Sequence, residues 1–256
     1  MKTLLLRSLT GLVFVALVVG SVLWDHIAFV CVFGFFTFVS LFEYARLREK
    51  TNGLKFQWHS IISGMLIYVA FYLNSLLFTE IPLLIVPAKV SPLFTEIIFS
   101  ITYIALPFSL LQVMPFIPVT IHFSFPVALC LFILIWTYDT FAYLTGMLFG
   151  RHKLAEKISP KKTWEGVIGG ALFCFASAYI LSLYVPELTI ALWFVFAVIT
   201  IIAGTIGDLF ESVLKRKADV KDSGAILPGH GGILDRFDAV LFIVPFVFLF
   251  LSFIKC

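Results

Sequence analysis

Long apolar blocks separated by short polar segments cover most of this chain. A helix needs about 20 mainly apolar residues to cross the hydrocarbon core of a bilayer. Blocks of suitable length predict eight membrane-spanning helices, at about residues 8–24, 27–45, 60–79, 94–113, 125–149, 166–185, 188–210 and 236–254. The charged Lys2 and Arg7 followed by an apolar run resemble a signal peptide, but no A-x-A-like cleavage site follows, and a new run begins at Ile27. We therefore expect the first block to be retained and to form a helical hairpin with the second.

The amino-acid composition favours the same class of protein. Apolar residues make up 61% of the chain and charged residues 13%, with a mean hydropathy of +1.07. A soluble domain carries roughly a quarter charged residues, so this composition excludes a soluble globule. The net charge of +3 is spread over several short loops, which argues against nucleic-acid binding. The four cysteines show neither a disulfide framework nor a zinc-binding pair.

Three polar segments, 46–55, 151–163 and 214–234, are rich in Lys and Arg, and the positive-inside rule places them in the cytoplasm. Three blocks separate the first two segments, although segments on the same side require an even number. A short extra span at 81–86, broken by Pro82 and Pro87, would restore the parity. We predict an all-α polytopic bundle of about nine spans with a cytoplasmic amino terminus. Counts of seven and eight stay open.

Charge is concentrated in residues 208–238. These 31 positions hold six of the 15 carboxylates and five of the 18 cations. A loop that only joins two helices needs few residues, so this one is predicted to hold a ligand. Asp208 precedes Arg216 by eight residues, roughly 12 Å along a helix, which puts a carboxylate below the membrane surface. The alternative for Asp208 is a structural ion pair with a lysine from another helix.

The helix that leaves this loop carries Asp235 and Asp238 on one face, with Arg236 between them. Anions and phosphates are both favoured at a helix N-terminus, so these acids either bind a ligand or cap the helix. Together with Asp208 they suit a hard cation, and Mg²⁺ is our first choice because it binds through one or two carboxylates plus substrate phosphate. The glycines around His230 allow a close approach of the backbone to a ligand.

The second basic loop shows a related pattern. The stretch GRHKLAEKISPKKTWEG brings Ser159, Lys161, Lys162 and Thr163 together just before a helix begins. A generic positive-inside loop would also explain the lysines. The helix before the loop carries Asp139, roughly 16 Å from the loop at Gly150, and an acid at that depth should face the interior of the bundle.

The run SVLKRKADVKDSGAILPGHGGILDRFD, from Ser212 to Asp238, resembles the signature of the phosphatidate cytidylyltransferases, or CDP-diacylglycerol synthases. The stretches WTYDTFAYLTG and ISPKKTWEG are also similar to those of that family. The resemblance implies an inner-membrane enzyme of phospholipid biosynthesis that joins CTP and phosphatidate into CDP-diacylglycerol and pyrophosphate and requires magnesium. It also implies a C-terminal catalytic region at 121–256, with cytoplasmic loops 151–164 and 214–234, after weakly patterned transmembrane helices at 1–120.

These residues suggest a route for that reaction. Metal and cations must offset the repulsion between two polyanions when the lipid phosphate attacks CTP. We expect Asp208 and Asp235, with Asp238 as a further candidate, to hold one or two Mg²⁺ ions; a second, monovalent cation stays open. The remaining assignments place Lys221, Arg236, His230 and Asp238 in catalysis, Ser159, Lys161, Lys162, Thr163, Lys215, Arg216, Gly231 and Gly232 in substrate binding, and Asp139 and Asp222 in support.

Other readings stay open at this point. A related lipid cytidylyltransferase or a polyprenol kinase would use similar chemistry on another lipid. A transporter would also need acids within the membrane, but it predicts polar residues along a path across the bilayer, whereas the charges of this chain collect on one side. Beyond CTP, phosphatidate and the bilayer, a homodimer is an open question.

Overall fold

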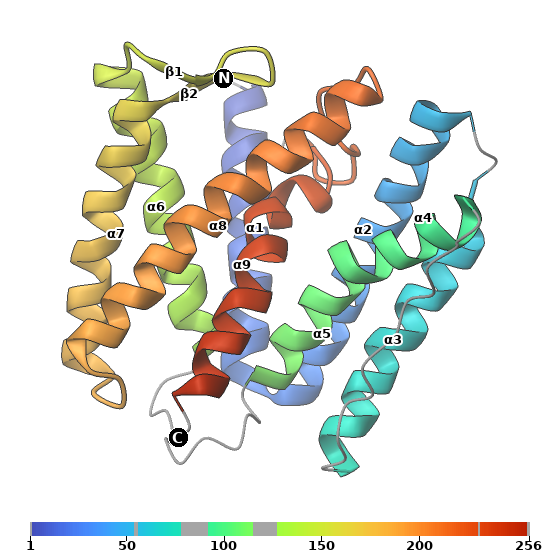
Figure 1. Cartoon of the computed structure of the whole chain (residues 1–256), viewed down its shortest axis with the longest axis horizontal. Coiled ribbons are helices and arrows are strands. Elements are labelled where there is room, and N and C mark those ends of the chain that lie inside the picture. The colour runs from blue at the N-terminus through green and yellow to red at the C-terminus, as the bar shows by residue number, and fades with distance from the viewer. Residues whose placement is uncertain (1, 54–55, 78–91, 115–126, 230, 255–256) are drawn as a thin grey trace. The chain divides into compact units, whose positions relative to one another are not determined.

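The computed structural model of the chain describes residues 2–53, 56–77, 92–114, 127–229 and 231–254 (Figure 1). The helices are α1 (Lys2–Trp24), α2 (His26–Asn52), α3 (Trp58–Leu77), α4 (Pro92–Ser100), α5 (Leu106–Val113), α6 (Val127–Phe149), α7 (Trp164–Tyr184), α8 (Ile190–Lys217) and α9 (Leu234–Phe253). A π-helical segment, η1 (Ile101–Ala105), joins α4 to α5. Two short strands, β1 (Lys153–Ala155) and β2 (Ser159–Thr163), lie between α6 and α7.

Each of the eight apolar blocks corresponds to a helix, if α4, η1 and α5 are taken as one continuous segment. Six helical segments in the described part of the chain are long and apolar enough to cross a membrane, and Ser8–Trp24 and Trp58–Leu73 are shorter apolar helices. The prediction of a polytopic helical membrane protein is therefore confirmed. The extra span expected at 81–86 lies outside the described residues, so the count of nine stays a prediction.

The predicted hairpin at the start of the chain is present. α1 ends at Trp24 and α2 begins at His26, with Asp25 as the residue between them. The Asp25 carboxylate accepts a hydrogen bond from the backbone N–H of Ile27 at 3.2 Å, which satisfies one of the open donors at the start of α2. The polar residue that interrupts the apolar pattern thus starts the second helix.

The chain divides into two compact units. The first contains residues 1–116 and 217–237, and the second contains residues 117–216 and 238–256. The segment 217–237, which holds most of the signature, therefore packs with the N-terminal helices. The functional division at residue 120 stays a prediction.

In the first unit, α2 packs against α1, α3 and α5. Phe237 is fully buried there, and its ring lies 5.6 Å from Phe14, 5.1 Å from Phe36 and 5.0 Å from Phe108, between ring centroids. Aromatic rings at these separations attract one another beyond the gain from burial alone. This aromatic cluster fixes the beginning of α9 against α1, α2 and α5.

In the second unit, α6 and α7 pack side by side, with the β1–β2 hairpin at one end of the pair (Figure 1). The two strands are antiparallel, with Lys153 opposite Thr163. We expected residues 151–164 to form a loop in an all-α protein, so the hairpin corrects that expectation. Its short strands lack the longer alternating pattern that reveals a strand in sequence.

Glycines on α7 allow the close packing of α6 and α7. A Cβ atom at Gly170 would lie 2.8 Å from both the Cβ of Ala142 and the carbonyl oxygen of Tyr138. Small residues are typical of such interfaces in membranes, where van der Waals packing holds helices together.

The substitution Gly170→Ala should therefore lower stability. Because the added methyl group has no room, we expect a cost of about 1–3 kcal/mol, seen as a lower Tm in detergent. The matched control is Gly20→Ala, because a Cβ at Gly20 meets nothing within 4 Å. Equal Tm values for the two variants would contradict the tight α6–α7 contact.

Candidate active site

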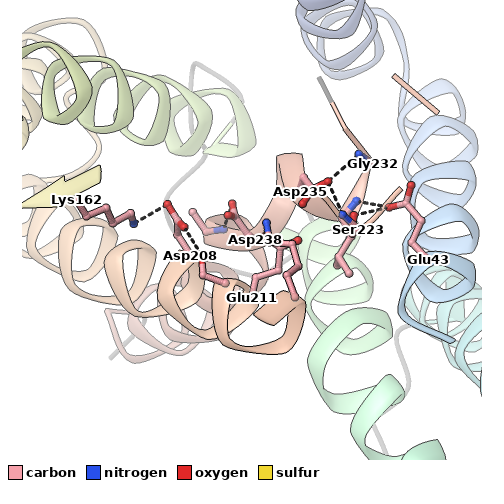
Figure 2. A network of polar contacts seen from close by, with 12 residues as sticks. Glu43, Lys162, Asp208, Glu211, Ser223, Gly232, Asp235 and Asp238 are labelled. Atoms are coloured by element: carbon pink, nitrogen blue, oxygen red, sulfur yellow. Dashed lines mark hydrogen bonds and ion pairs between the residues drawn. The ribbon is translucent and has the colours of Figure 1, made fainter. Parts of the chain in front are cut away.

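The signature loop of the first unit, residues 218–233, folds around one buried carboxylate. Glu43 of α2 is 2% exposed and accepts hydrogen bonds from the Ser223 hydroxyl (3.1 Å) and from the backbone N–H groups of Ile233 (3.2 Å) and Leu234 (2.8 Å). Figure 2 shows Glu43 pointing at this loop from its helix. Its contacts join residues more than 170 positions apart in the sequence, so an N-terminal helix organises the C-terminal signature.

Asp235 holds the same loop from inside. Its Oδ2 atom accepts hydrogen bonds from the backbone N–H groups of Ser223 at 2.9 Å and Gly232 at 2.8 Å (Figure 2). Gly231 has a φ angle of +85°, which favours glycine over any residue with a side chain. Gly231 also forms a bridge with Leu227, with its carbonyl oxygen accepting from the Leu227 N–H at 3.0 Å. These hydrogen bonds thus hold the described residues of the loop in place.

These contacts change the expected role of the helix N-terminus. The sequence predicts that N–H groups at the start of α9 help to bind phosphate, but in the structure Ile233 and Leu234 donate to Glu43. A protein carboxylate therefore occupies the place of a bound anion. Among the residues of this unit predicted to act on the substrate phosphates, the long charged side chains are exposed. Lys221 and Arg236 are both exposed, as is Asp222. His230 lies outside the described residues, so its predicted role has no structural description.

In the second unit, Asp208 of α8 forms an ion pair with Lys162 of β2, with 2.5 Å between Oδ2 and Nζ (Figure 2). The Ser212 hydroxyl also lies 3.4 Å from Oδ1 of Asp208. This is the lysine contact that the sequence left open as an alternative, although the lysine comes from a strand and not from a helix. The pair brings together two of the predicted site residues, one from each motif of the second unit.

Asp238 of α9 belongs to this group as well. Its carboxylate lies close enough to Asp208 and Asp139 for the negative charges to repel one another. The close approach of α8 to α9 depends on Gly207, where a Cβ would lie 2.6 Å from the carbonyl oxygen of Asp238. Three predicted carboxylates thus share one region of the second unit. Asp139 is exposed on α6, so the structure does not bury it in the interior of the bundle as we expected.

Two predicted substrate-binding cations differ in their surroundings. Lys215 forms an ion pair with Glu211 one turn earlier on α8, at 2.7 Å, and Glu211 is fully buried. This pairing gives Lys215 a structural contact, because a buried charge is costly unless it is paired. Arg216, by contrast, is exposed at the end of α8.

The β1–β2 hairpin positions the second basic motif. Thr163 is the N-cap of α7, and its hydroxyl accepts from the Gly166 N–H at 3.2 Å. Glu165 accepts from the backbone N–H groups of Arg151 and His152, and from Nδ1 of His152 at 2.5 Å. These contacts tie the hairpin to the first turn of α7. Lys161 remains exposed, while Ser159 is partly exposed.

The donor set in the second unit is compatible with magnesium but not with a closed metal cage. Among the residues that the structure describes, no group of three or more His, Cys, Asp or Glu side chains could hold a metal ion. Mg²⁺ needs fewer protein ligands, because it binds through one or two carboxylates and takes its other ligands from water and substrate phosphate. Asp208 and Asp238 are the two carboxylates of this region that belong to the predicted site, and Asp208 is paired with Lys162.

Glu43 is the site residue that the sequence did not reveal. It stands at the end of the apolar block at 27–45, where a polar residue is expected at a membrane surface. The sequence offers one indication of its importance. Glu43 is a carboxylate that lies two residues before the end of the apolar block, ahead of the first cation, Arg46. A charged residue inside an apolar run needs a partner, but the sequence does not indicate which one.

Comparison with known proteins identifies the family of the chain. The model of the cytidylyltransferase family matches residues 5–254. A protein of Staphylococcus aureus strain COL named phosphatidate cytidylyltransferase is 50% identical over 116 residues, which are 44% of this chain and 44% of that protein. A protein of Haemophilus influenzae with the same name is 43% identical over 131 residues, 49% of this chain and 46% of that protein. The chain thus matches about half the length of these curated relatives. Because the family model covers nearly the whole chain, the chain belongs to the cytidylyltransferase family.

Proposed function

We propose that this protein is a phosphatidate cytidylyltransferase, which transfers CMP from CTP to phosphatidate and so makes CDP-diacylglycerol for phospholipid synthesis. The observation that carries the proposal is the family match over residues 5–254, which includes both motifs of the candidate active site. The two relatives described above are both named phosphatidate cytidylyltransferase. The proposal includes a bundle of about nine spans in the cell's inner membrane. The positive-inside rule places the site on the cytoplasmic side, where CTP is present.

The reaction requires no nucleophile from the protein. An oxygen of the lipid phosphate forms a bond to the α-phosphorus of CTP, and the bond from that phosphorus to the bridging oxygen of the β-phosphate breaks. Pyrophosphate leaves with the negative charge that develops on that oxygen. The protein must therefore bring two polyanions together and stabilise the leaving group. The exposed cations Lys221 and Arg236 suit the second task, and Lys161 suits the orientation of a phosphate.

Asp208 and Asp238 are the residues that we propose as magnesium ligands in the second unit. When bound, the ion neutralises charge on the triphosphate and makes the α-phosphorus more electrophilic. Lys162 is well placed to orient the Asp208 carboxylate, since the two form an ion pair. The role of Asp235 as a further ligand stays a prediction from the sequence. Its Oδ2 accepts two hydrogen bonds from the loop, and a carboxylate has a second oxygen for other contacts.

An assay with labelled CTP tests the proposal against its alternatives. The purified full chain in detergent, with phosphatidate, Mg²⁺ and CTP labelled at the α-phosphate, should yield a chloroform-soluble labelled lipid and one pyrophosphate for each CTP consumed. Excess EDTA should stop product formation, and added Mg²⁺ should restore it. A CTP-dependent lipid kinase would leave the α-label in water-soluble CDP. Labelled lipid from another acceptor, with none from phosphatidate, would contradict the substrate assignment.

A further inference from the structure

We propose that Glu43 is a positioning residue for this reaction, acting through the signature loop that carries Lys221 and through the start of α9 that carries Arg236. This inference rests on the proposed function for its effect on turnover, and on the structure alone for its effect on the loop. Glu43 is absent from both sequence motifs, and it belongs to the weakly patterned N-terminal helices.

The geometry around Glu43 is that of an occupied anion site. Oε1 accepts from the Ile233 N–H, and Oε2 accepts from the Leu234 N–H and the Ser223 hydroxyl. Leu234 is the first residue of α9, so the carboxylate also lies at the positive end of that helix dipole. With only 2% of the residue exposed, these donors replace the water that an ionised carboxylate requires.

The loop is shaped to leave room for this carboxylate. Gly224 and Gly232 both face it, and a Cβ atom on either residue would collide with its oxygens. The two glycines come from opposite ends of the loop, before and after the turn at Gly229 and Gly231. The loop backbone therefore closes around Glu43, which indicates a specific anchor, since simple burial of an acid would not require glycine on both sides.

The anchored positions lie between the two cations assigned to catalysis. Ser223 follows Lys221 by two residues, and Leu234 precedes Arg236 by two residues. A carboxylate bound to both Ser223 and Leu234 thus fixes both ends of the segment between the two cations. Loss of the anchor should weaken the contacts of these cations with the triphosphate, while the acceptor lipid is affected less.

The decisive variant is Glu43→Gln, which keeps the size of the side chain but turns one acceptor oxygen into an NH₂ donor facing other donors. We expect kcat/KM for CTP to fall about tenfold, mainly through KM, because hydrogen bonds to a charged group are lost. The KM for phosphatidate should stay within about twofold of its original value. The matched control is Thr37→Val on the same helix, since Thr37 is also fully buried but bonds only to Phe33 of its own helix in the contacts described.

Hydrogen exchange gives a second readout that does not depend on activity. Peptides that cover 223–234 should exchange faster in Glu43→Gln than in the original protein, while Thr37→Val should leave them unchanged. If Glu43→Gln does not fold, Ser223→Ala removes one of the three donors and should raise the KM for CTP about threefold.

The outcomes separate the two proposals. An original protein that makes no CDP-lipid from phosphatidate would refute the proposed function, and the exchange measurement would still decide whether Glu43 holds the loop. In an active protein, the inference fails if Glu43→Gln keeps its kcat/KM for CTP. It also fails if Thr37→Val loses as much, if both substrates show the same rise in KM, or if exchange in 223–234 is unchanged. For Ser223→Ala, an unchanged KM for CTP would count against the inference.

Discussion

Asp208→Asn should reduce CDP-lipid formation by at least about 100-fold in a protein that remains folded. Asparagine has nearly the same shape but lacks the charge that a metal ligand needs. The Asp208 side chain is 34% exposed and is paired with Lys162, so it lies in a polar region where the substitution leaves no large cavity. The measurement is the rate of labelled lipid formation, together with the Tm in detergent.

Two further variants separate a functional carboxylate from a structural ion pair. Glu156→Gln makes the same chemical change at an exposed position of the hairpin and should leave the rate unchanged. If the Lys162–Asp208 pair were only structural, the double variant Lys162→Gln/Asp208→Asn would recover activity relative to Asp208→Asn, because no unpaired charge remains. We expect the double variant to stay inactive. Recovery of activity would contradict the role of Asp208 at the reaction centre.

Gly232→Ala should lower both kcat and kcat/KM about 30-fold, because it deforms the signature loop itself. A Cβ atom at this position would collide with the Ser223 hydroxyl and with both carboxylate oxygens of Glu43. Gly232 also donates its N–H to Asp235, so a shift of its backbone loosens the second anchor as well. The measurement is kcat and KM for CTP.

The matched control is Gly20→Ala in the same unit, where the added Cβ meets no atom within 4 Å. This variant should keep the original rate. Gly224→Ala, which introduces a collision with the same carboxylate from the other end of the loop, should behave like Gly232→Ala. A normal rate in both loop variants would show that the loop tolerates displacement, and it would remove the structural basis for the effect.

Much of the fold could be predicted because each helix is a local feature of the sequence. A run of apolar residues identifies a span regardless of its partners, and Asp25 marks the turn between α1 and α2 by its own capping contact. The β1–β2 hairpin was missed because its strands have only three and five residues and are mostly polar. The division into two units was not predicted either. It depends on the packing of Phe237 against distant residues such as Phe14 and Phe108, which the sequence around Phe237 does not indicate.

The candidate site was predictable where its residues form a continuous motif. Asp208, Asp235, Lys162 and Thr163 all stand in or beside such motifs, although only the structure shows that Lys162 pairs with Asp208 and that Thr163 caps α7. Glu43 could not be found in this way, because its partners lie 180 to 191 positions away. A carboxylate near the membrane surface has many potential partners, and spacing in the sequence does not choose among them.

The long separation between Glu43 and Leu234 also bears on how the protein is made. Membrane helices enter the bilayer in order as the ribosome proceeds, and contacts between distant residues form late. The α6–α7 pair and its hairpin are complete once residue 184 has been inserted. Glu43, however, must wait for its partners until nearly the whole chain of 256 residues has been synthesised. During that interval the Glu43 carboxylate lacks its three donors, so the signature loop can close around it only after Leu234 has been synthesised.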